Sequence, residues 1–299
     1  MRQRVLRASA SIAIATLIVS TVLSGQGNPK KSIFMCFTDQ AGKPVRNVSG
    51  EIFIREDGVD RQIVEVKAAS QPISVALLVD TAQGKRVTDA YGTPEEYVHD
   101  LRVAVTAFAR QLLNQAPDAS LSLMEFGQAA MTMVPYTSAF EEIDKGAKRI
   151  VSRPDVGSVL FEGLIQANGD LARRPGRRAI VSLNLEPSDE QSREDPKKVQ
   201  TTFAQSGAQL WAVSVQRGGL KNSKRDLVLN DLAKATGGQR DFVVGISAVE
   251  GILKNYADAL TAQFEVVYER PENAKNVKAV QVGTSAQGVK IHASGFAPQ

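Results

Sequence analysis

Asp80 is the residue of this sequence with the strongest claim to chemistry, because of its neighbours. A continuous apolar run, residues 75–79, precedes it and suits a strand that is buried on both faces of a parallel sheet. The chain then turns polar and reaches Gly84. Ligands of open α/β sheets bind beyond the carboxyl ends of the strands. A carboxylate at this point could hold a divalent cation, or it could accept hydrogen bonds from its own loop.

Elsewhere the residue types that catalysis needs are sparse. The two histidines, His99 and His292, fall in a predicted helix and in a predicted C-terminal strand, which lie far apart in the expected fold. Neither a zinc cluster nor a Ser-His-Asp triad is supported. The sequence has no Gly-x-Gly-x-x-Gly motif and no phosphate-binding glycine loop. We therefore predict no enzymatic activity, and an envelope hydrolase is retained as a third alternative.

A basic cluster, Arg173, Arg174, Arg177 and Arg178, precedes a predicted buried strand. It can be a solvated helix end, where positive charge interacts favourably with the helix dipole. It can also be a patch that binds an anion or the cell envelope. The sequence leaves both alternatives open.

The elements that must position Asp80 alternate between strand and helix over residues 71–262, which predicts a mostly parallel sheet between helices. One helix is expected to begin at Thr93, with Pro94 in its first turn and Glu96 completing a capping box. Another is expected over residues 227–236, closed by Gly237 and Gly238. Further strands are predicted at residues 121–126, 131–135, 178–185, 209–215 and 241–243.

Short strand patterns flank this unit on both sides, in residues 30–70 and 263–299. Three short strands make a weak domain alone, so we infer that the early strands pair with the late ones. The predicted fold is α/β and Rossmann-like, with the unit of residues 71–262 inserted into a small β-sandwich.

The first 25 residues read as a secretory signal peptide, with three arginines followed by an apolar stretch and small residues. An uncleaved membrane anchor is the alternative, and it is the only membrane association expected. Removing residues 1–25 lowers the net charge from +4 to +1, so the basic balance does not indicate nucleic-acid binding. The expected location is periplasmic, cell-surface or secreted. The single cysteine, Cys36, lies in an apolar run and is predicted to be a buried, inert thiol.

Several short stretches together resemble the exported bacterial proteins with von Willebrand factor A-like domains. Residues 75–80 are similar to the first strand of that domain, and residues 178–181 to a later strand. The stretches 38–45, 56–58, 232–238 and 295–298 are similar to other parts of the family pattern. The resemblance implies a Rossmann-like fold and a role in protein–protein interaction.

In that family a metal-ion-dependent adhesion site holds a divalent cation through Asp-x-Ser-x-Ser, a threonine and a later aspartate. Here Ala82 and Gly84 stand at the two serine positions, and Leu185 stands at the position of the aspartate. The resemblance therefore implies a degenerate site, because Mg²⁺ and Ca²⁺ need about six oxygen ligands. We expect no metal and no other cofactor. The alternative is a rebuilt Mg²⁺ or Ca²⁺ site made by Asp80, Ser158 and Glu186.

The function predicted from these observations is an exported, non-catalytic protein-binding or scaffold module that acts without metal. Its partner is expected to be a protein of unknown identity that contacts the loops at the carboxyl ends of the strands. A metal-dependent adhesion domain is the second alternative. The predicted contact residues are Thr81, Gln83, Lys85, Arg86, Ser158 and Glu186.

Overall fold

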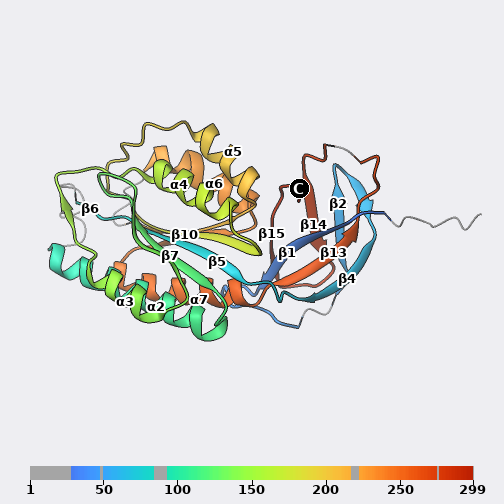
Figure 1. The fold of residues 1–299 in the computed structure, drawn as a ribbon, viewed down its shortest axis with the longest axis horizontal. Coiled ribbons are helices and arrows are strands. Elements are labelled where there is room, and N and C mark those ends of the chain that lie inside the picture. The colour runs from blue at the N-terminus through green and yellow to red at the C-terminus, as the bar shows by residue number, and fades with distance from the viewer. Residues whose placement is uncertain (1–27, 48–49, 84–92, 217–221, 275, 299) are drawn as a thin grey trace, which may run out of the picture.

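A computed structural model describes residues 28–47, 50–83, 93–216, 222–274 and 276–298, so the predicted signal peptide lies outside the described residues. Figure 1 shows a large α/β unit, with helices above and below a sheet, beside a smaller all-β unit. Within the described residues, no helix combines the length and the apolar character needed to cross a membrane.

The central sheet has six strands in the order β12-β11-β10-β5-β7-β8, and all neighbouring pairs are parallel except β7 and β8. The strands are β5 (Ile73–Val79), β7 (Ser120–Glu125), β8 (Met131–Thr137), β10 (Arg177–Leu185), β11 (Gln209–Val215) and β12 (Gln239–Val243). The predicted fold class, a mostly parallel sheet between helices with additional β-structure from both ends of the chain, is confirmed.

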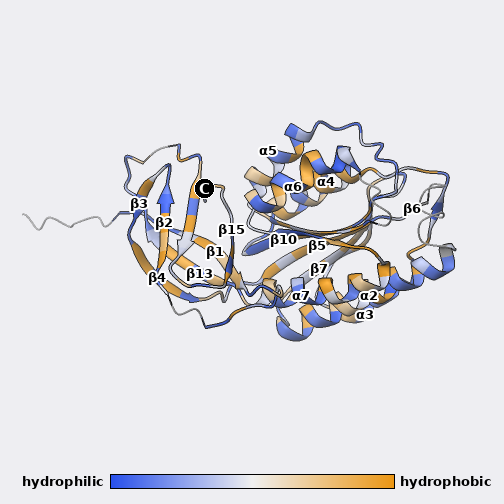
Figure 2. Cartoon of the chain, turned by 180° about the vertical axis from the view of Figure 1, so that it is seen from behind, coloured by the Kyte–Doolittle hydropathy of each residue, from blue (hydrophilic) through white to orange (hydrophobic). Residues whose placement is uncertain are grey.

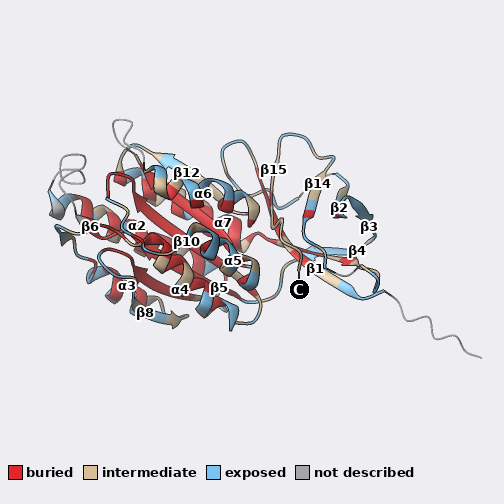
Figure 3. Cartoon of the chain, turned by 90° about the horizontal axis from the view of Figure 1, so that it is seen from above, coloured by how far each residue is buried: buried red, intermediate tan, exposed pale blue. Residues whose placement is uncertain are grey.

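Strand β5 is buried along its whole length because both of its faces are covered. Val75, Leu77 and Val79 pack into one apolar cluster, and Ala76 and Leu78 pack into another on the opposite face. This two-sided burial explains why the sequence has a continuous apolar run here. Figure 3, which is seen from above, shows that the central strands are buried.

Helices cover the two faces of the sheet in separate layers (Figure 2), with hydrophobic residues on the sides that pack against the sheet. One layer contains α2 (Pro94–Gln115), α3 (Phe140–Lys148) and α7 (Val249–Thr261). The short 3₁₀ helix η1 (Ile246–Ala248) directly precedes α7. The other contains α4 (Leu160–Ala172), α5 (Pro196–Ser206) and α6 (Ser223–Ala235).

The helix ends follow the local sequence signals. Helix α2 begins after Thr93, whose backbone N–H donates to the Glu96 carboxylate at 3.2 Å. Gly237, which has a φ of +77°, follows the end of helix α6, and Gly238 N–H donates to Ala233 O at 2.8 Å. The start of α6 was predicted four residues too late. Asn222 caps the helix by accepting from the N–H of Arg225, so Arg225 belongs to its first turn.

The smaller unit contains a four-stranded sheet, β15-β1-β13-β4, and a three-stranded sheet, β14-β2-β3, and both combine N-terminal and C-terminal strands. An apolar cluster that includes Met35, Phe37, Ile54 and Val266 draws on strands of both sheets. Cys36 is fully buried as predicted, and burial raises the pKa of its thiol to about 12. The strands are β1 (Lys30–Thr38), β2 (Ile52–Glu56), β3 (Val59–Arg61), β4 (Ile63–Ala68), β13 (Phe264–Glu269), β14 (Val280–Thr284) and β15 (Lys290–Ala293).

Candidate functional site

Asp80 follows β5 directly and is fully buried at the carboxyl edge of the central sheet. Its Oδ1 accepts from the N–H of Ala82 at 3.1 Å, and its Oδ2 accepts from the N–H of Leu185 at 3.2 Å. The carboxylate therefore joins the loop after β5 to the end of β10. This is one of the two roles that the sequence left open for it.

The guanidinium of Arg225 contacts both Asp80 and Ser158, and its side chain has no exposed surface. Its Nη2 donates to Asp80 Oδ2 at 2.7 Å and also to Ser158 Oγ. Its Nη1 donates to the carbonyl oxygen of Leu185 at 3.0 Å. A built-in cation is thus bonded to two of the three side chains that were candidates for a metal.

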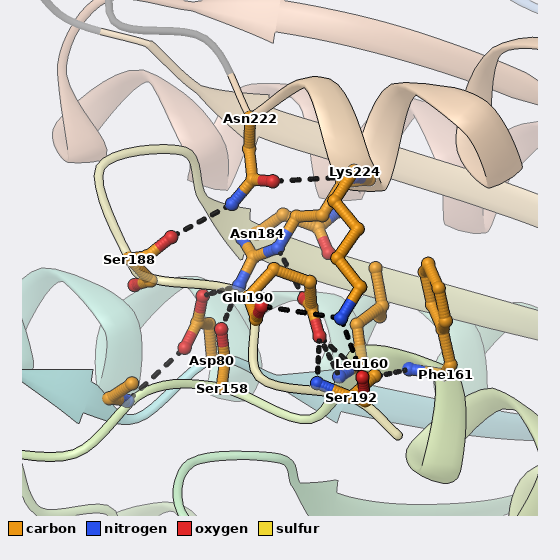
Figure 4. A network of polar contacts seen from close by, with 12 residues as sticks. Asp80, Ser158, Leu160, Phe161, Asn184, Ser188, Glu190, Ser192, Asn222 and Lys224 are labelled. Carbon is orange, nitrogen blue, oxygen red and sulfur yellow. Dashed lines mark hydrogen bonds and ion pairs between the residues drawn. The ribbon is translucent and has the colours of Figure 1, made fainter. Parts of the chain in front are cut away.

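Glu190 supplies a second buried carboxylate to the same cation. Its Oε2 accepts from Arg225 Nε at 2.9 Å, while its Oε1 accepts from Ser192 Oγ at 2.6 Å and from the N–H of Leu160 at 3.3 Å. Figure 4 shows Asp80, Ser158 and Glu190 converging, with Ser192 on the far side of Glu190. Leu160 begins α4, so the positive end of a helix dipole also compensates this carboxylate.

The charged groups of this cluster depend on one another, because each is buried. Burial alone would lower the pKa of Arg225, but the carboxylates of Asp80 and Glu190 raise it, so the guanidinium stays charged. Burial raises the pKa of Asp80, and Arg225 opposes that rise. A buried ion pair that loses one partner leaves an uncompensated charge. The cluster is therefore stable only while the arginine and its acidic partners are all present.

Glu186 follows Leu185 directly, but its carboxylate bonds to an arginine other than Arg225. Its Oε1 accepts from Arg240 Nη2 at 2.9 Å, and Arg240 also pairs with Asp226 at 2.6 Å. Successive side chains of an extended strand point to opposite faces, and Glu186, one residue beyond Leu185, contacts an arginine of β12. Asp80, Ser158 and Glu186, the ligands of the alternative metal site, therefore divide between Arg225 and Arg240 in this structure.

Thr81 belongs to another buried contact at the same edge of the sheet. Its Oγ1 donates to Glu125 Oε2 at 3.1 Å, and Arg153 pairs with the same carboxylate. A Cβ added at Gly127 would lie 2.5 Å from Thr81 Oγ1, so the loop after β7 packs tightly on this threonine. Arg153, Arg225 and Arg240 thus each neutralise acidic side chains along the carboxyl edge.

The predicted contact residues divide into three groups. Thr81, Ser158 and Glu186 are at most 3% exposed, so their side chains support the loops from beneath and do not face solvent. That these loops contact a partner stays a prediction. Gln83 pairs with Pro154 in the short strand pair of β6 (Ala82–Gln83) and β9 (Arg153–Pro154). Lys85 and Arg86 lie outside the described residues.

A divalent cation does not fit the arrangement of side chains at Asp80. The oxygen atoms that would bind it, Asp80 Oδ2 and Ser158 Oγ, already accept hydrogen bonds from Arg225. Where the structure describes the chain, no group of three or more His, Cys, Asp or Glu side chains is arranged to hold a metal ion. A cation added to this cluster would also be repelled by the buried guanidinium.

Sequence reasoning missed Arg225 and Glu190. In the sequence, Arg225 lies 145 positions from Asp80 and 35 positions from Glu190, so no local pattern connects these residues. A physical signal was nevertheless present. A buried carboxylate needs a cation or several hydrogen bonds, and Asp80 follows a buried strand while Ala82 and Gly84 stand where the resemblance implies hydroxyl ligands. That combination favours a search for an arginine or lysine near the other strand ends.

The histidines are separated as expected. His99 lies on α2, in a surface groove shared with α3 and α7. His292 lies on β15, where Thr38 Oγ1 is 2.8 Å from its Nε2 and Gly238 O is 3.3 Å from its Nδ1. Burial lowers the pKa of His292. Neither arrangement joins a histidine to a nucleophile and a carboxylate, as a hydrolytic triad requires.

Several solved structures have folds similar to that of this chain. A von Willebrand factor type A protein from Catenulispora acidiphila matches with a TM-score of 0.53 at 11% identity, over 86% of this chain and 75% of that one. The chain has a von Willebrand factor A fold. Proximal thread matrix protein 1 from the mussel byssus matches with a TM-score of 0.52 at 9% identity, over 69% of this chain and 51% of that one.

A second structure of the mussel protein has a zinc-occupied metal-ion-dependent adhesion site, and it matches with a TM-score of 0.51 at 12% identity, over 67% of this chain and 48% of that one. This chain thus spans about half the length of the mussel protein. No protein-family model and no curated protein matches the sequence. At these identities the likeness establishes the fold, and the site has to be interpreted from its own residues.

Proposed function

We propose that this chain is an exported, non-catalytic protein-binding module that recognises its partner without a metal ion. The observation that carries the proposal is the buried guanidinium of Arg225, bonded to Asp80, Ser158 and Glu190. In this von Willebrand factor A fold, Arg225 supplies the positive charge at the carboxyl edge of the sheet that a divalent cation supplies in the metal-binding members of the family.

The replacement changes how a partner can be bound. A divalent cation with an open coordination position can accept an acidic side chain from a partner, whereas Arg225 is fully buried and its Nε, Nη1 and Nη2 atoms all donate within the chain. Recognition would therefore depend on the shape and polarity of the loops that the cluster holds in place. The preorganised loops reduce the entropy lost on binding.

The contact surface that we propose consists of exposed residues in the loops above this cluster. Asp155 and Gln191 lie in the loops that flank Ser158, and Gln128 follows β7. The Ser158 loop is fixed to the loop after β10 because Ser158 N–H donates to Asp189 O and Gln191 N–H donates to Ser158 O, each at 2.8 Å. The two loops would therefore meet a partner as one surface.

Calorimetric titration of the purified protein with Mg²⁺, Ca²⁺ and Mn²⁺ tests the metal-independence directly. We expect no saturable heat and no change in the melting temperature. The matched variant is Asp80→Ala, because it removes the carboxylate that any metal at this site would need. Saturable binding in the natural protein that disappears in Asp80→Ala would overturn the proposal.

Affinity capture from the envelope fraction tests the binding surface. A Gln128→Arg/Asp155→Arg/Gln191→Arg variant should lose a partner that the natural protein retains in the presence of a chelator. The control is Glu141→Arg, an exposed position at the first turn of α3. Loss of the partner on chelation, or equal capture by both variants, would contradict this surface.

A further inference from the structure

Strand β4 forms the outer edge of the four-stranded sheet in the smaller unit (Figure 1). Among the described strands, it pairs with β13 alone. All five residues 64–68 are exposed, and Val64 and Val66 retain 43% and 44% of their accessible surface. An open strand edge with apolar side chains is a surface to which another strand can add.

The direction of the backbone groups can be derived from the pairing with β13. Ala69 N–H donates to Gln263 O at 2.9 Å, so the polar backbone groups of Ala69 point toward β13. The register between residues 65 and 69 is regular, because Glu65 pairs with Val267 and Ala68 with Phe264. Backbone groups alternate in direction along a strand. The N–H and C=O groups of Val66 and Ala68 therefore point outward, to the open edge.

Natural edge strands are often protected by charged side chains and by bulges. Strand β4 has both features, since it carries Glu65 and Lys67 and its register with β13 shifts between Val267 and Tyr268. The two charges are opposite in sign and two residues apart, so both lie on the same face of the strand. Because the two charges are opposite in sign, the pair complements an antiparallel copy of itself.

We propose that β4 pairs antiparallel with β4 of a second copy of this chain, in a register centred on Val66. That register places Glu65 opposite Lys67 of the second copy, and Lys67 opposite its Glu65. Val66 then faces Val66, and Val64 faces Ala68. Opposite charges and apolar residues that face each other across strands stabilise antiparallel pairs.

The same register also satisfies the outward backbone groups. Val66 would exchange two N–H···O=C bonds with Val66 of the second copy, because both residues direct their polar groups to the open edge. The two four-stranded sheets would then join into one continuous sheet. The side chains of Val64 and Val66 would pack beside those of the copy, which removes part of their apolar surface from water.

Sedimentation of the purified protein over a concentration series tests the pairing. We expect a monomer–dimer equilibrium, and a Glu65→Lys variant should lower the association constant about tenfold, since two favourable charge pairs become two repulsive ones. The Glu65→Lys/Lys67→Glu variant restores opposite charges in the same register and should recover dimerisation. Glu65→Lys is the cleaner single variant, because Lys67 also lies 3.7 Å from Glu265 in its own chain.

Two further variants separate edge pairing from other effects. Val66→Pro removes an outward N–H without removing a bond to β13, so it should abolish the dimer and leave the fold intact. Glu250→Lys on α7 makes the same charge change as Glu65→Lys at another exposed position, 37% against 50%, and should leave the equilibrium unchanged. A protein that stays monomeric, or a dimer that Glu65→Lys and Val66→Pro leave unchanged, would overturn the proposal.

Discussion

At the scale of single residues, Arg225 supplies the positive charge that balances the buried carboxylates at the carboxyl edge of the sheet. Its guanidinium donates to Asp80, Ser158, Glu190 and the carbonyl oxygen of Leu185. Arginine suits this position because its planar fork can bind several oxygen atoms and keeps its charge when buried. Burial of one cation between two carboxylates costs desolvation, and the hydrogen bonds of the cluster offset that cost.

Arg225→Ala should therefore destabilise the protein by about 3–5 kcal/mol, because it leaves the carboxylates of Asp80 and Glu190 buried without their cation. Chemical denaturation measures the loss. Added Mn²⁺ or Mg²⁺ should recover part of the stability of this variant, since the oxygen atoms that Arg225 occupied become available to a metal.

Arg240→Ala is the control for this metal effect. It also removes a buried arginine from a carboxylate at the same edge of the sheet, Glu186, but away from the Asp80 cluster. Its stability should fall without recovery by divalent cations. Equal recovery in both variants would mean that the metal binds elsewhere, and an unchanged stability of Arg225→Ala would contradict the role assigned to the guanidinium.

At the scale of secondary-structure elements, two helices of one layer are followed by glycines with a positive φ in different surroundings. Gly207 follows α5 with a φ of +65°, and Gly237 follows α6 with a φ of +77°. A Cβ at Gly207 would meet no atom within 4 Å, whereas a Cβ at Gly237 would lie 2.2 Å from the carbonyl carbon of Ala293. Gly237 is therefore the point where α6 packs against β15 of the smaller unit.

Replacement of each glycine by alanine separates these two effects. Gly207→Ala should cost about 1–2 kcal/mol, the ordinary penalty of a left-handed conformation. Gly237→Ala should cost more, because the backbone at Ala293 must move as well. Thermal or urea unfolding of the two variants provides the comparison, and equal losses would contradict the close contact between α6 and β15.

The elements also show what a sequence can and cannot predict. The run at residues 75–79 and the Thr93 cap were informative because burial on two faces and helix capping leave local patterns. The start of α6 left only a weak pattern, so the helix was predicted to begin after Arg225. Its contact with Asp80 spans 145 positions and depends on how β5, β10 and α6 meet, which no local pattern contains.

At the scale of the whole molecule, a buried carboxylate joins the strands of the smaller unit. Glu56, at the end of β2, has no exposed surface and accepts from Tyr268 Oη at 2.6 Å, Arg61 Nε at 2.8 Å and Arg270 Nε at 2.8 Å. Burial alone would raise its pKa, but the hydrogen bonds from Arg270, Tyr268 and Arg61 lower it below the ordinary value of 4.5. The charged form is thus favoured in the folded state.

This shift predicts a specific dependence of stability on pH. Because the folded pKa of Glu56 is lower than the unfolded one, its contribution is present above pH 4.5 and is lost as the pH falls through the folded pKa. Glu56→Gln should therefore be less stable than the natural protein at pH 7, by about 1–3 kcal/mol. The difference should shrink below about pH 4.

Unfolding curves from pH 3 to pH 7 measure this difference. Glu250→Gln is the control, because Glu250 is a surface residue whose partner Lys254 is also exposed. Its stability should follow the natural protein at every pH. A constant deficit of Glu56→Gln over the whole range would show that the lost hydrogen bonds matter, but that the charge does not.

The chain crosses between the two units before β5 and after α7, and one arginine contacts both crossings. Arg177 is 6% exposed, so the solvated role that the sequence allowed for it is corrected. Its Nε donates to Gln71 O at 2.8 Å, and its Nη1 donates to Leu260 O at 2.8 Å and to Gln263 Oε1 at 3.2 Å. Gln71 precedes β5, and Gln263 precedes β13. Arg177 therefore couples the units through hydrogen bonds at both crossings.

Arg177→Met keeps much of the aliphatic length but leaves three acceptors without their donor, which should cost about 2–4 kcal/mol. Amide hydrogen exchange should become faster at residues 69–72 and 261–264. Arg178→Met is the matched control, because Arg178 donates to Arg174 O and Ser206 O within the α/β unit. It should speed exchange near the ends of α4 and α5 and leave the crossings protected. If both variants loosened the same amides, the coupling would reside in the apolar contacts between the units, and Arg177 would be a local support of β10.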